Sequence, residues 1–221
     1  MTPYYEQDGI TIYHGDCREV LPSVWLGVDL LLTDPPYGIN AVVRGKTFGT
    51  SNACEVNSYN PVHDDDKPFD PSHLMALPCR KVLFGANHYG AHMPSSSCWL
   101  VWDKRDGTRS NPLADCELAW TDICGPSRLF SHRWMGMIRA SEQERRVHPT
   151  QKPVALMRWI IQNWTQHGHL VLDPYMGSGP VLVAAKELGR RAIGVEIEER
   201  YCEIAAKRLA QGVLPLQEAS A

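Results

Sequence analysis

Long apolar runs are absent from this sequence. No apolar segment approaches the roughly 20 residues that a helix needs to cross a bilayer, so we predict no membrane-spanning helix and no membrane partner. The first residues, from Met1 to Glu6, carry neither a basic region nor a following apolar stretch. We therefore expect no signal peptide.

Paired cysteines are absent as well. The seven cysteines are odd in number and scattered, with no C-x-x-C pair among positions 17, 54, 79, 98, 116, 124 and 202. A disulfide framework or a zinc knuckle would need regular pairs, so we expect reduced thiols and a cytoplasmic location.

A strong excess of positive charge is also missing, because the formal net charge is −3. The charge is uneven, however: between Gly125 and Lys152, six lysines and arginines stand against two glutamates, a local balance of +4. A modest basic face suits an enzyme that must follow DNA and also release it. Taken alone, the stretch fits a solvated loop with surplus arginine equally well. The candidate DNA contacts in it are Arg128, Arg133, Arg139, Arg145 and Arg146.

The 221 residues suffice for one α/β domain with a full core. Apolar runs alternate with amphipathic stretches, which predicts a doubly wound, mostly parallel sheet of seven strands. We expect strands over Ile10–Tyr13, Val28–Thr33, Lys81–Gly85, Cys98–Trp102, Cys116–Thr121, His169–Leu172 and Ala192–Val195. We expect helices over Asp70–Leu77, Pro153–Thr165, Pro180–Leu188 and Glu198–Ala210. Two of these helices start at a proline, the position where proline is best tolerated.

Two long stretches show little periodicity. Residues 38–69 contain Gly, Asn, Ser and Pro and an acidic run from Asp64 to Asp66, while residues 122–147 are basic and irregular. Loops of this length in compact domains are usually lids or binding segments. Within a single domain spanning 1–221, we therefore expect a mobile active-site and DNA loop at 38–69 and a target-recognition region at 122–147.

The most informative motif is Thr33-Asp34-Pro35-Pro36-Tyr37, directly after an apolar run. Ligands of open α/β sheets bind beyond the carboxyl ends of the strands, which is where this loop would lie. The prolines stiffen the backbone and leave carbonyl acceptors, so that one carbonyl and the Asp34 carboxylate can accept both hydrogens of an amino group. The ring of Tyr37 offers a face on which a base can stack, worth roughly 1–3 kcal/mol. The alternative interpretation is a Pro-Pro turn that only ends a strand.

A second motif joins an apolar run to a glycine turn and a helix, over residues 170–180. Such a loop allows close backbone approach to a ligand. Its spacing matches neither the dinucleotide fingerprint nor the phosphate loop, which disfavours NAD and ATP. Glu196, at the end of the next predicted strand, is placed to bind ribose hydroxyls. Alternatively, Glu196 is an ordinary acid beside a helix.

Three motifs in order resemble the DNA methyltransferases that methylate exocyclic amino groups: Asp-Pro-Pro-Tyr at 34–37, His-Pro-Thr-Gln-Lys-Pro at 148–153 and Asp-Pro-Tyr-Met-Gly-Ser-Gly at 173–179. The catalytic motif precedes the cofactor loop, as in the circularly permuted beta group of these enzymes. Stretches at 66–70, 84–89 and 99–106 are similar to phage and prophage members. The resemblance, which spans about residues 10–210, implies the methyltransferase sheet and S-adenosyl-L-methionine as the cofactor.

The resemblance implies a role for each matching position. The target amino group would be held at the catalytic motif, formed by Asp34, Pro35, Pro36 and Tyr37. The cofactor would be bound by the acid near its adenine and its neighbour, by the glycine loop, by the ribose acid and by the histidine-proline motif: Asp16, Cys17, Asp34, His148, Thr150, Gln151, Lys152, Asp173, Pro174, Tyr175, Gly177, Ser178, Gly179 and Glu196. Thr150 and Lys152 are the candidates for the methionine carboxylate. Two positions depart from the family pattern: Tyr175 replaces phenylalanine, and Pro180 replaces threonine.

Other possible site residues fit less well. Cys79 follows a proline, as the nucleophile of cytosine-C5 methyltransferases does, but Asp34 to Tyr37 already occupy the catalytic position. His88 and His92 have the spacing of metal ligands on a helix, yet no third ligand stands near them. We predict no metal site, and a core position or a DNA contact for Trp134.

The resemblance implies base flipping followed by direct methyl transfer to adenine N6 of double-stranded DNA. The pocket chemistry would serve cytosine N4 equally, although cytosine enzymes more often carry serine in place of Asp34. RNA, a protein glutamine, or a non-catalytic subunit that binds nucleic acid for a partner remain alternatives. The recognition region is small, so a homodimer is an open possibility, and any restriction nuclease would be a separate protein.

Overall fold

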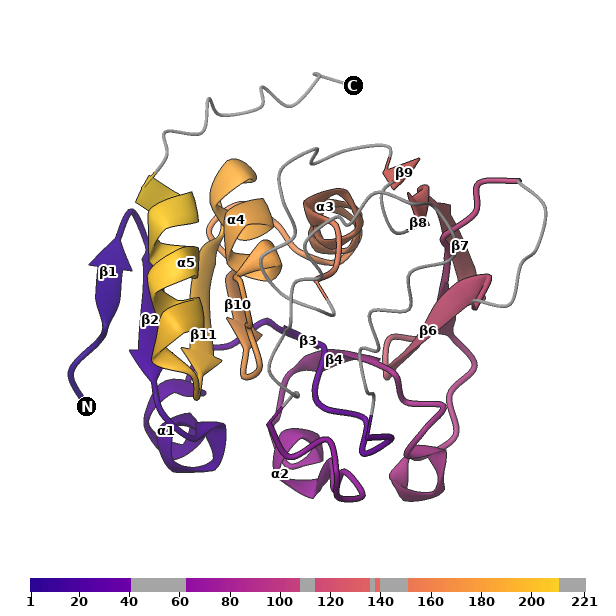
Figure 1. Cartoon of the computed structure of the whole chain (residues 1–221), viewed down its shortest axis with the longest axis horizontal. Coiled ribbons are helices and arrows are strands. Elements are labelled where there is room, and N and C mark those ends of the chain that lie inside the picture. The colour runs from indigo at the N-terminus through magenta and orange to yellow at the C-terminus, as the bar shows by residue number, and fades with distance from the viewer. Residues whose placement is uncertain (41–62, 108–113, 136–137, 140–150, 211–221) are drawn as a thin grey trace, which may run out of the picture.

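The computed structural model describes residues 1–40, 63–107, 114–135, 138–139 and 151–210. One large sheet organises these residues, with nine strands in the order β1-β2-β11-β10-β3-β4-β6-β5-β7 (Figure 1). The strands of this sheet are β1 (Tyr5–Gln7), β2 (Ile10–His14), β3 (Leu30–Thr33), β4 (Arg80–Phe84), β5 (Trp99–Asp103), β6 (Cys116–Thr121), β7 (Arg128–Ser131), β10 (Leu170–Asp173) and β11 (Arg191–Glu196). A separate two-stranded sheet pairs β8 (Trp134–Met135) with β9 (Ile138–Arg139).

The centre of the large sheet is parallel. Strands β2, β11, β10, β3 and β4 run parallel to one another, whereas β6 lies antiparallel between β4 and β5, β7 is parallel to β5, and β1 is antiparallel to β2. All four residues of both β3 and β10 are buried, as expected for central strands covered on both faces. The carboxyl ends of the parallel strands therefore meet at one edge.

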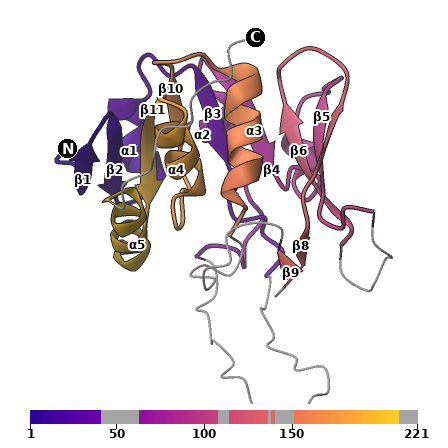
Figure 2. The same cartoon turned by 90° about the horizontal axis from the view of Figure 1, so that it is seen from above.

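Helices cover both faces of the sheet. They are α1 (Cys17–Val24), α2 (Ser72–Met75), α3 (Val154–Trp164), α4 (Pro180–Glu187) and α5 (Glu199–Ala210), with a short 3-10 turn η1 (Gly90–His92). Helices α5, α4 and α3 follow one another along one face, and α1 and α2 lie on the other (Figures 1 and 2). Alternate residues of β3 serve the two layers: Leu30 and Leu32 pack on the α3–α4–α5 side, and Leu31 packs with α1 and α2.

Most of the predicted elements are confirmed within two residues at their ends, and so are the fold class and the mostly parallel sheet. The expectation of seven strands was wrong, because β1 and β7 extend the sheet to nine. The helix predicted over Asp70–Leu77 is shorter, with only Ser72–Met75 helical.

Helix α1 was not predicted, because Pro22 lies inside it and a proline inside a helix usually breaks or kinks it. Its buried residues are Cys17, Val20, Leu21 and Val24, which have the spacing of one helical face. The Asp16 side chain caps the helix by accepting the Arg18 N–H. The cap and the spacing were therefore visible in the sequence.

The sequence had suggested that residues 122–147 are irregular, but part of this stretch forms strands. Strand β7 belongs to the main sheet, where it pairs with β5, and β8 and β9 form a hairpin. Within the part of the chain that the structure describes, no helix is long and apolar enough to cross a membrane.

Candidate active site

A cavity of about 720 Å³ lies at the carboxyl ends of the parallel strands. The loops that follow β2, β3, β10 and β11 all line it, so residues far apart in sequence share one site. The predicted site residues along its wall are Asp16, Cys17, Asp34, Pro35, Pro36, Tyr37, Gln151, Lys152, Asp173, Pro174, Tyr175, Gly177, Ser178 and Glu196. The remaining described residue of the predicted cofactor loop, Gly179, is the N-cap of α4 and lies between Ser178 and Pro180, which both line the cavity.

The two main motifs lie side by side because β3 pairs with β10. The Thr33 hydroxyl donates to Asp173 Oδ1 at 2.7 Å, and the Tyr175 N–H reaches the same oxygen at 3.2 Å. Asp173 is 3% exposed, and its burial raises the pKa to about 7. This carboxyl group therefore ties the glycine loop to the residue before Asp34.

The glycine loop turns through left-handed backbone at Gly177, with φ +50°, and at Gly179, with φ +75°. Glu196 at the end of β11 holds this turn, because its Oε2 accepts the Gly177 N–H at 2.9 Å. Its Oε1 accepts the Glu198 N–H at 2.8 Å. Burial raises the pKa of Glu196, while these backbone donors oppose that rise.

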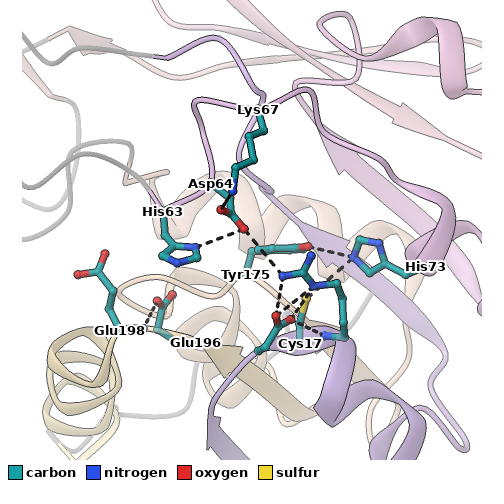
Figure 3. Close-up of polar contacts among 10 residues, drawn as sticks. Cys17, His63, Asp64, Lys67, His73, Tyr175, Glu196 and Glu198 are labelled. Atoms are coloured by element: carbon teal, nitrogen blue, oxygen red, sulfur yellow. Dashed lines mark hydrogen bonds and ion pairs between the residues drawn. The ribbon is translucent and has the colours of Figure 1, made fainter.

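A network of ion pairs closes one side of the cavity (Figure 3). Arg18 pairs with Asp16 at 2.6 Å and reaches Asp64 at 3.8 Å. Asp64 also lies 3.1 Å from Lys67 and 3.6 Å from His63. The hydrogen bonds and charge of Arg18 lower the pKa of Asp16. The 63–67 segment is thereby linked to the start of α1.

Tyr175, which departs from the family pattern, has a partner for its additional hydroxyl (Figure 3). The hydroxyl oxygen lies 2.9 Å from His73 Nε2, and Cys17 Sγ lies 3.9 Å from the same nitrogen. Burial lowers the pKa of His73, which favours the neutral ring. The Phe69 ring packs edge-on against both Tyr175 and His73.

The catalytic motif is tightly enclosed. The Tyr37 hydroxyl donates to Asp34 Oδ1 at 2.5 Å, and the Lys152 ammonium donates to Asp34 Oδ2 at 2.5 Å. The Tyr37 ring stacks on His88, with ring centres 5.2 Å apart and 15° between the planes. One face of Tyr37 is thus covered by His88.

Lys152 bridges two carboxylates. Besides Asp34 it lies 3.1 Å from Glu117 Oε2, and Lys104 donates to Glu117 Oε1 at 2.9 Å. Burial alone would raise the pKa of Glu117, but Lys152 and Lys104 outweigh it and lower the pKa to about 2. Burial raises the pKa of Asp34, and Lys152 opposes that rise. Lys152 points at Asp34 here, and its predicted contact with the methionine carboxylate stays a prediction.

Sequence reasoning missed Glu117 and Lys104 as site residues. Glu117 lies on β6 and Lys104 directly follows β5, and these strands pair so that Trp102 is opposite Glu117. No motif marks either residue, because their approach to Asp34 depends on how distant strands are ordered in the sheet. The signal that existed was a charged residue inside an otherwise apolar strand.

The other predicted residues lie as follows. Gln151 is buried, and its backbone carbonyl accepts the indole N–H of Trp134 at 3.2 Å. Trp134 is 2% exposed and belongs to the hydrophobic core, as predicted, and it also lines the cavity, so the suggested DNA contact stays a prediction. Outside the described residues are His148, Thr150, Arg145 and Arg146.

Of the three remaining candidate DNA contacts, Arg128 and Arg133 are not among the residues that line the cavity. Arg128 is exposed at the start of the edge strand β7, Arg133 is half-buried between β7 and β8, and Arg139 is in β9. The structure does not bring Arg128 or Arg133 together with Asp34. Their role in binding DNA stays a prediction.

The structure also locates Cys79, the alternative nucleophile, and His88, one of the two alternative metal ligands. Cys79 precedes β4, whose first residue is opposite Leu30, so Cys79 lies at the other end of the sheet from Asp34. Burial raises its thiol pKa, which disfavours the reactive thiolate. His88 packs on Tyr37. Among the residues that the structure describes, no cluster of three His, Cys, Asp or Glu side chains could hold a metal ion.

Comparison with known proteins gives consistent matches. The sequence model of a family described as DNA methylase, the N6/N4 type, matches residues 99–207. The chain is 47% identical to the type II methyltransferase M2.DpnII of Streptococcus pneumoniae, with 94% of this chain and 92% of that protein covered.

Solved structures share the fold. The complex of M1.HpyAVI with S-adenosylmethionine superposes with a TM-score of 0.55 at 24% identity, covering 91% of this chain and 99% of that one. The cytosine-N4-specific PvuII DNA methyltransferase superposes with a TM-score of 0.62 at 16% identity, covering 96% of this chain and 90% of that one.

Proposed function

The chain belongs to the N6/N4 family of DNA methylases, and from this premise we propose that it transfers a methyl group from S-adenosyl-L-methionine to adenine N6 in double-stranded DNA. The observation that carries the proposal is the joint position of Asp34 and the glycine loop on one cavity. Direct transfer to an amino group needs an acceptor for its hydrogens beside the methyl donor, and these two motifs are neighbours across β3 and β10.

The cavity fits S-adenosyl-L-methionine, the family's cofactor. The turn at Gly177 and Gly179 lets a ligand approach the backbone, and the acid Glu196 at the end of β11 suits ribose hydroxyls. We place the methionine half at the loop of Asp173 and Tyr175. Near the adenine we place Asp16 and Cys17, and over the methionine His148, Thr150 and Gln151.

When bound, the cofactor supplies an electrophilic methyl group. The chain's own residues orient the acceptor. Asp34 and the Pro35 carbonyl would accept hydrogen bonds from the two amino hydrogens, which favours a pyramidal nitrogen with its lone pair directed at the methyl group. Most of the rate would come from this positioning. Cys79 lies at the far end of the sheet, in agreement with a transfer that needs no covalent enzyme intermediate.

The target base must leave the duplex to reach Asp34, at a cost of a few kcal/mol. Stacking on the Tyr37 ring would offset part of this cost. We propose that the duplex is held by the basic residues of 122–147, among them Arg128, and by the 38–69 loop. The type II relatives suggest a restriction–modification role with a separate nuclease.

Adenine is favoured over cytosine by the resemblance of Asp-Pro-Pro-Tyr to adenine enzymes. The cytosine-N4-specific structural relative keeps cytosine as the alternative base. The order of the motifs, with Asp34 ahead of Asp173, favours the circularly permuted beta group.

The deciding experiment incubates the protein with unmethylated DNA and S-adenosyl-L-methionine, digests the DNA to nucleosides and measures them by mass spectrometry. We expect N6-methyladenine. N4-methylcytosine would keep the mechanism and change the base, and no methylated nucleoside despite cofactor binding would overturn the proposal.

A matched variant tests the role of Asp34. Asp34→Ala should abolish methyl transfer while the cofactor Kd changes by no more than a few-fold, because Asp34 is assigned to the acceptor. Loss of cofactor binding together with transfer, measured by calorimetry, would instead make Asp34 structural.

A further inference from the structure

Four charged side chains of alternating sign form a row that ends in the catalytic motif. They form a row from Lys104 through Glu117 and Lys152 to Asp34, with successive charged atoms 2.9, 3.1 and 2.5 Å apart. Lys152 is 4% exposed, and all four residues line the cavity. We call these four residues the charge row.

The row draws on separate parts of the fold. Asp34 follows β3, Glu117 is on β6, Lys104 follows β5 and Lys152 lies just before α3. The buried Lys152 ammonium has a carboxylate on each side, so its charge is compensated. A single buried ion of this kind would cost several kcal/mol, and a core that needed only volume would be served as well by an apolar side chain.

The contacts fix the Asp34 carboxylate at both oxygens. Oδ1 accepts from the Tyr37 hydroxyl, and Oδ2 accepts from Lys152. Because Glu117 lies on the opposite side of Lys152, it limits where the ammonium can point. Removing Glu117 would therefore loosen a group that touches Asp34.

We propose that Glu117 is a positioning residue for methyl transfer, which holds the Lys152 ammonium against Asp34 and so keeps this carboxylate aimed at the target amino group. The inference rests on the function proposed above and deepens it. In this role Glu117 acts through Lys152.

The charged and titratable groups around Asp34 determine its pKa. The titratable groups that act on it or sense its charge come from several elements: Lys152, Glu117, Tyr37, Tyr89 and Asp173. Burial and the Glu117 charge raise the pKa of Asp34, and Lys152 and Tyr37 lower it. Loss of the Lys152 charge should therefore raise the pKa of Asp34.

A double-mutant cycle with Glu117→Gln and Lys152→Met tests the coupling. We expect kcat to fall by roughly 10-fold for Glu117→Gln and roughly 100-fold for Lys152→Met, since small misplacements cost such factors. If Glu117 acts through Lys152, Glu117→Gln should cause no further loss in the Lys152→Met background. Its cofactor Kd should stay unchanged. Losses that multiply, or a raised cofactor Kd with normal kcat, would overturn the inference.

The control variant is Glu203→Gln, which removes an exposed ion pair with Lys207 on α5, where the oxygen and nitrogen lie 2.6 Å apart. It should behave as the wild type. If Lys152→Met does not fold, Lys152→Gln takes its place, because its amide can still donate to Asp34 without a charge.

A measurement independent of activity separates this inference from the proposed function. Carbon-13 NMR of the aspartate carboxyl groups, with Asp34 assigned through Asp34→Asn, should show the pKa of Asp34 higher in Lys152→Met than in the wild type. An unchanged pKa overturns the inference even if the wild type methylates DNA. A raised pKa in a protein without methyl transfer supports the charge row and rejects the methylation proposal.

Discussion

Tyr37 owes its position to a residue with no side chain. Gly85 follows β4 with a left-handed φ of +69°, and a Cβ at this position would overlap the Tyr37 ring. The tyrosine therefore lies directly on the glycine backbone, with His88 stacked on the ring. Both the backbone conformation and the close approach require glycine here.

Gly85→Ala should accordingly move Tyr37 and reduce methyl transfer by roughly 100-fold, the cost of a displacement of about 1 Å. The control is Gly27→Ala, which has a similar φ of +78° but no atom within 4 Å of the added Cβ. Both variants should lose ~1–3 kcal/mol of folding free energy from the strained backbone. Equal methyl-transfer rates in the two variants would contradict the packing argument.

Asp173 makes the folding stability depend on pH. Its pKa is about 7 in the folded protein and 3.8 ordinarily, so the folded state binds the proton more tightly. Below pH 3.8 Asp173 is protonated in both the folded and the unfolded state, so it does not lower the free energy of unfolding. As the pH rises to about 7, the unfolded state gains by ionising, and the folded protein becomes less stable.

Asp173→Asn should remove this dependence. Relative to the wild type, the variant should gain on the order of 2–3 kcal/mol in unfolding free energy between pH 5 and pH 8, because one pKa unit corresponds to ~1.4 kcal/mol. Urea unfolding across this range measures the gain. If the unfolding free energies of the two proteins differ by the same amount at every pH in this range, Asp173 is ionised throughout it.

Among the connecting segments, the acidic run 64–66 shows how an element anchors the catalytic loop. Asp65 is 6% exposed, and its Oδ1 accepts the backbone N–H of Gly38 at 2.9 Å. Its carbonyl accepts the Asn40 N–H at 2.7 Å. Asp64 instead joins the ion-pair network at Arg18, and Asp66 is exposed. Three identical residues thus have three different surroundings.

Asp65→Ala should loosen the segment after Tyr37, lowering stability by ~1–3 kcal/mol through unpaired N–H groups and reducing methyl transfer about 10-fold or more. Asp66→Ala, in the same run, should change neither by a measurable amount. Thermal unfolding and methyl-transfer rates compare the two. A large effect of Asp66→Ala would point to a charge effect of the run as a whole.

At the scale of the whole molecule, the cavity exists because the sheet order places β3 beside β10 although the motifs are 140 residues apart in sequence. A ligand in this cavity contacts loops from both ends of the chain. It should therefore stabilise the folded protein as a unit, by an amount that follows from mass action.

S-adenosyl-L-methionine at 100 times its Kd should add ~2.7 kcal/mol and raise the Tm by roughly 5–10 °C. NAD and ATP at the same concentration should leave the Tm unchanged, because the glycine loop has the spacing of neither the dinucleotide fingerprint nor the phosphate loop. Glu196→Ala should lose most of the shift, whereas Glu203→Ala on the exposed face of α5 should keep it. A shift with ATP alone would reject the assigned cofactor.

The sequence by itself determined the α/β class, the order of the main strands and helices, and the motifs at Asp34 and Asp173. These features depend on local patterns: apolar runs, glycine turns and prolines at helix starts. Patterns failed where an element is not locally typical. Strand β7 begins at Arg128 and is mostly exposed, and α1 contains Pro22, so neither carried the usual signal.

Only the tertiary structure decided which charged groups meet. Glu117 and Lys104 gave no motif, and Lys152 was expected at the cofactor, yet all three form a row that ends at Asp34. The same holds for the stacking of His88 on Tyr37. Such contacts depend on strand order and burial. A charge pair becomes strong only where folding removes water from around it. No short stretch of sequence encodes that environment.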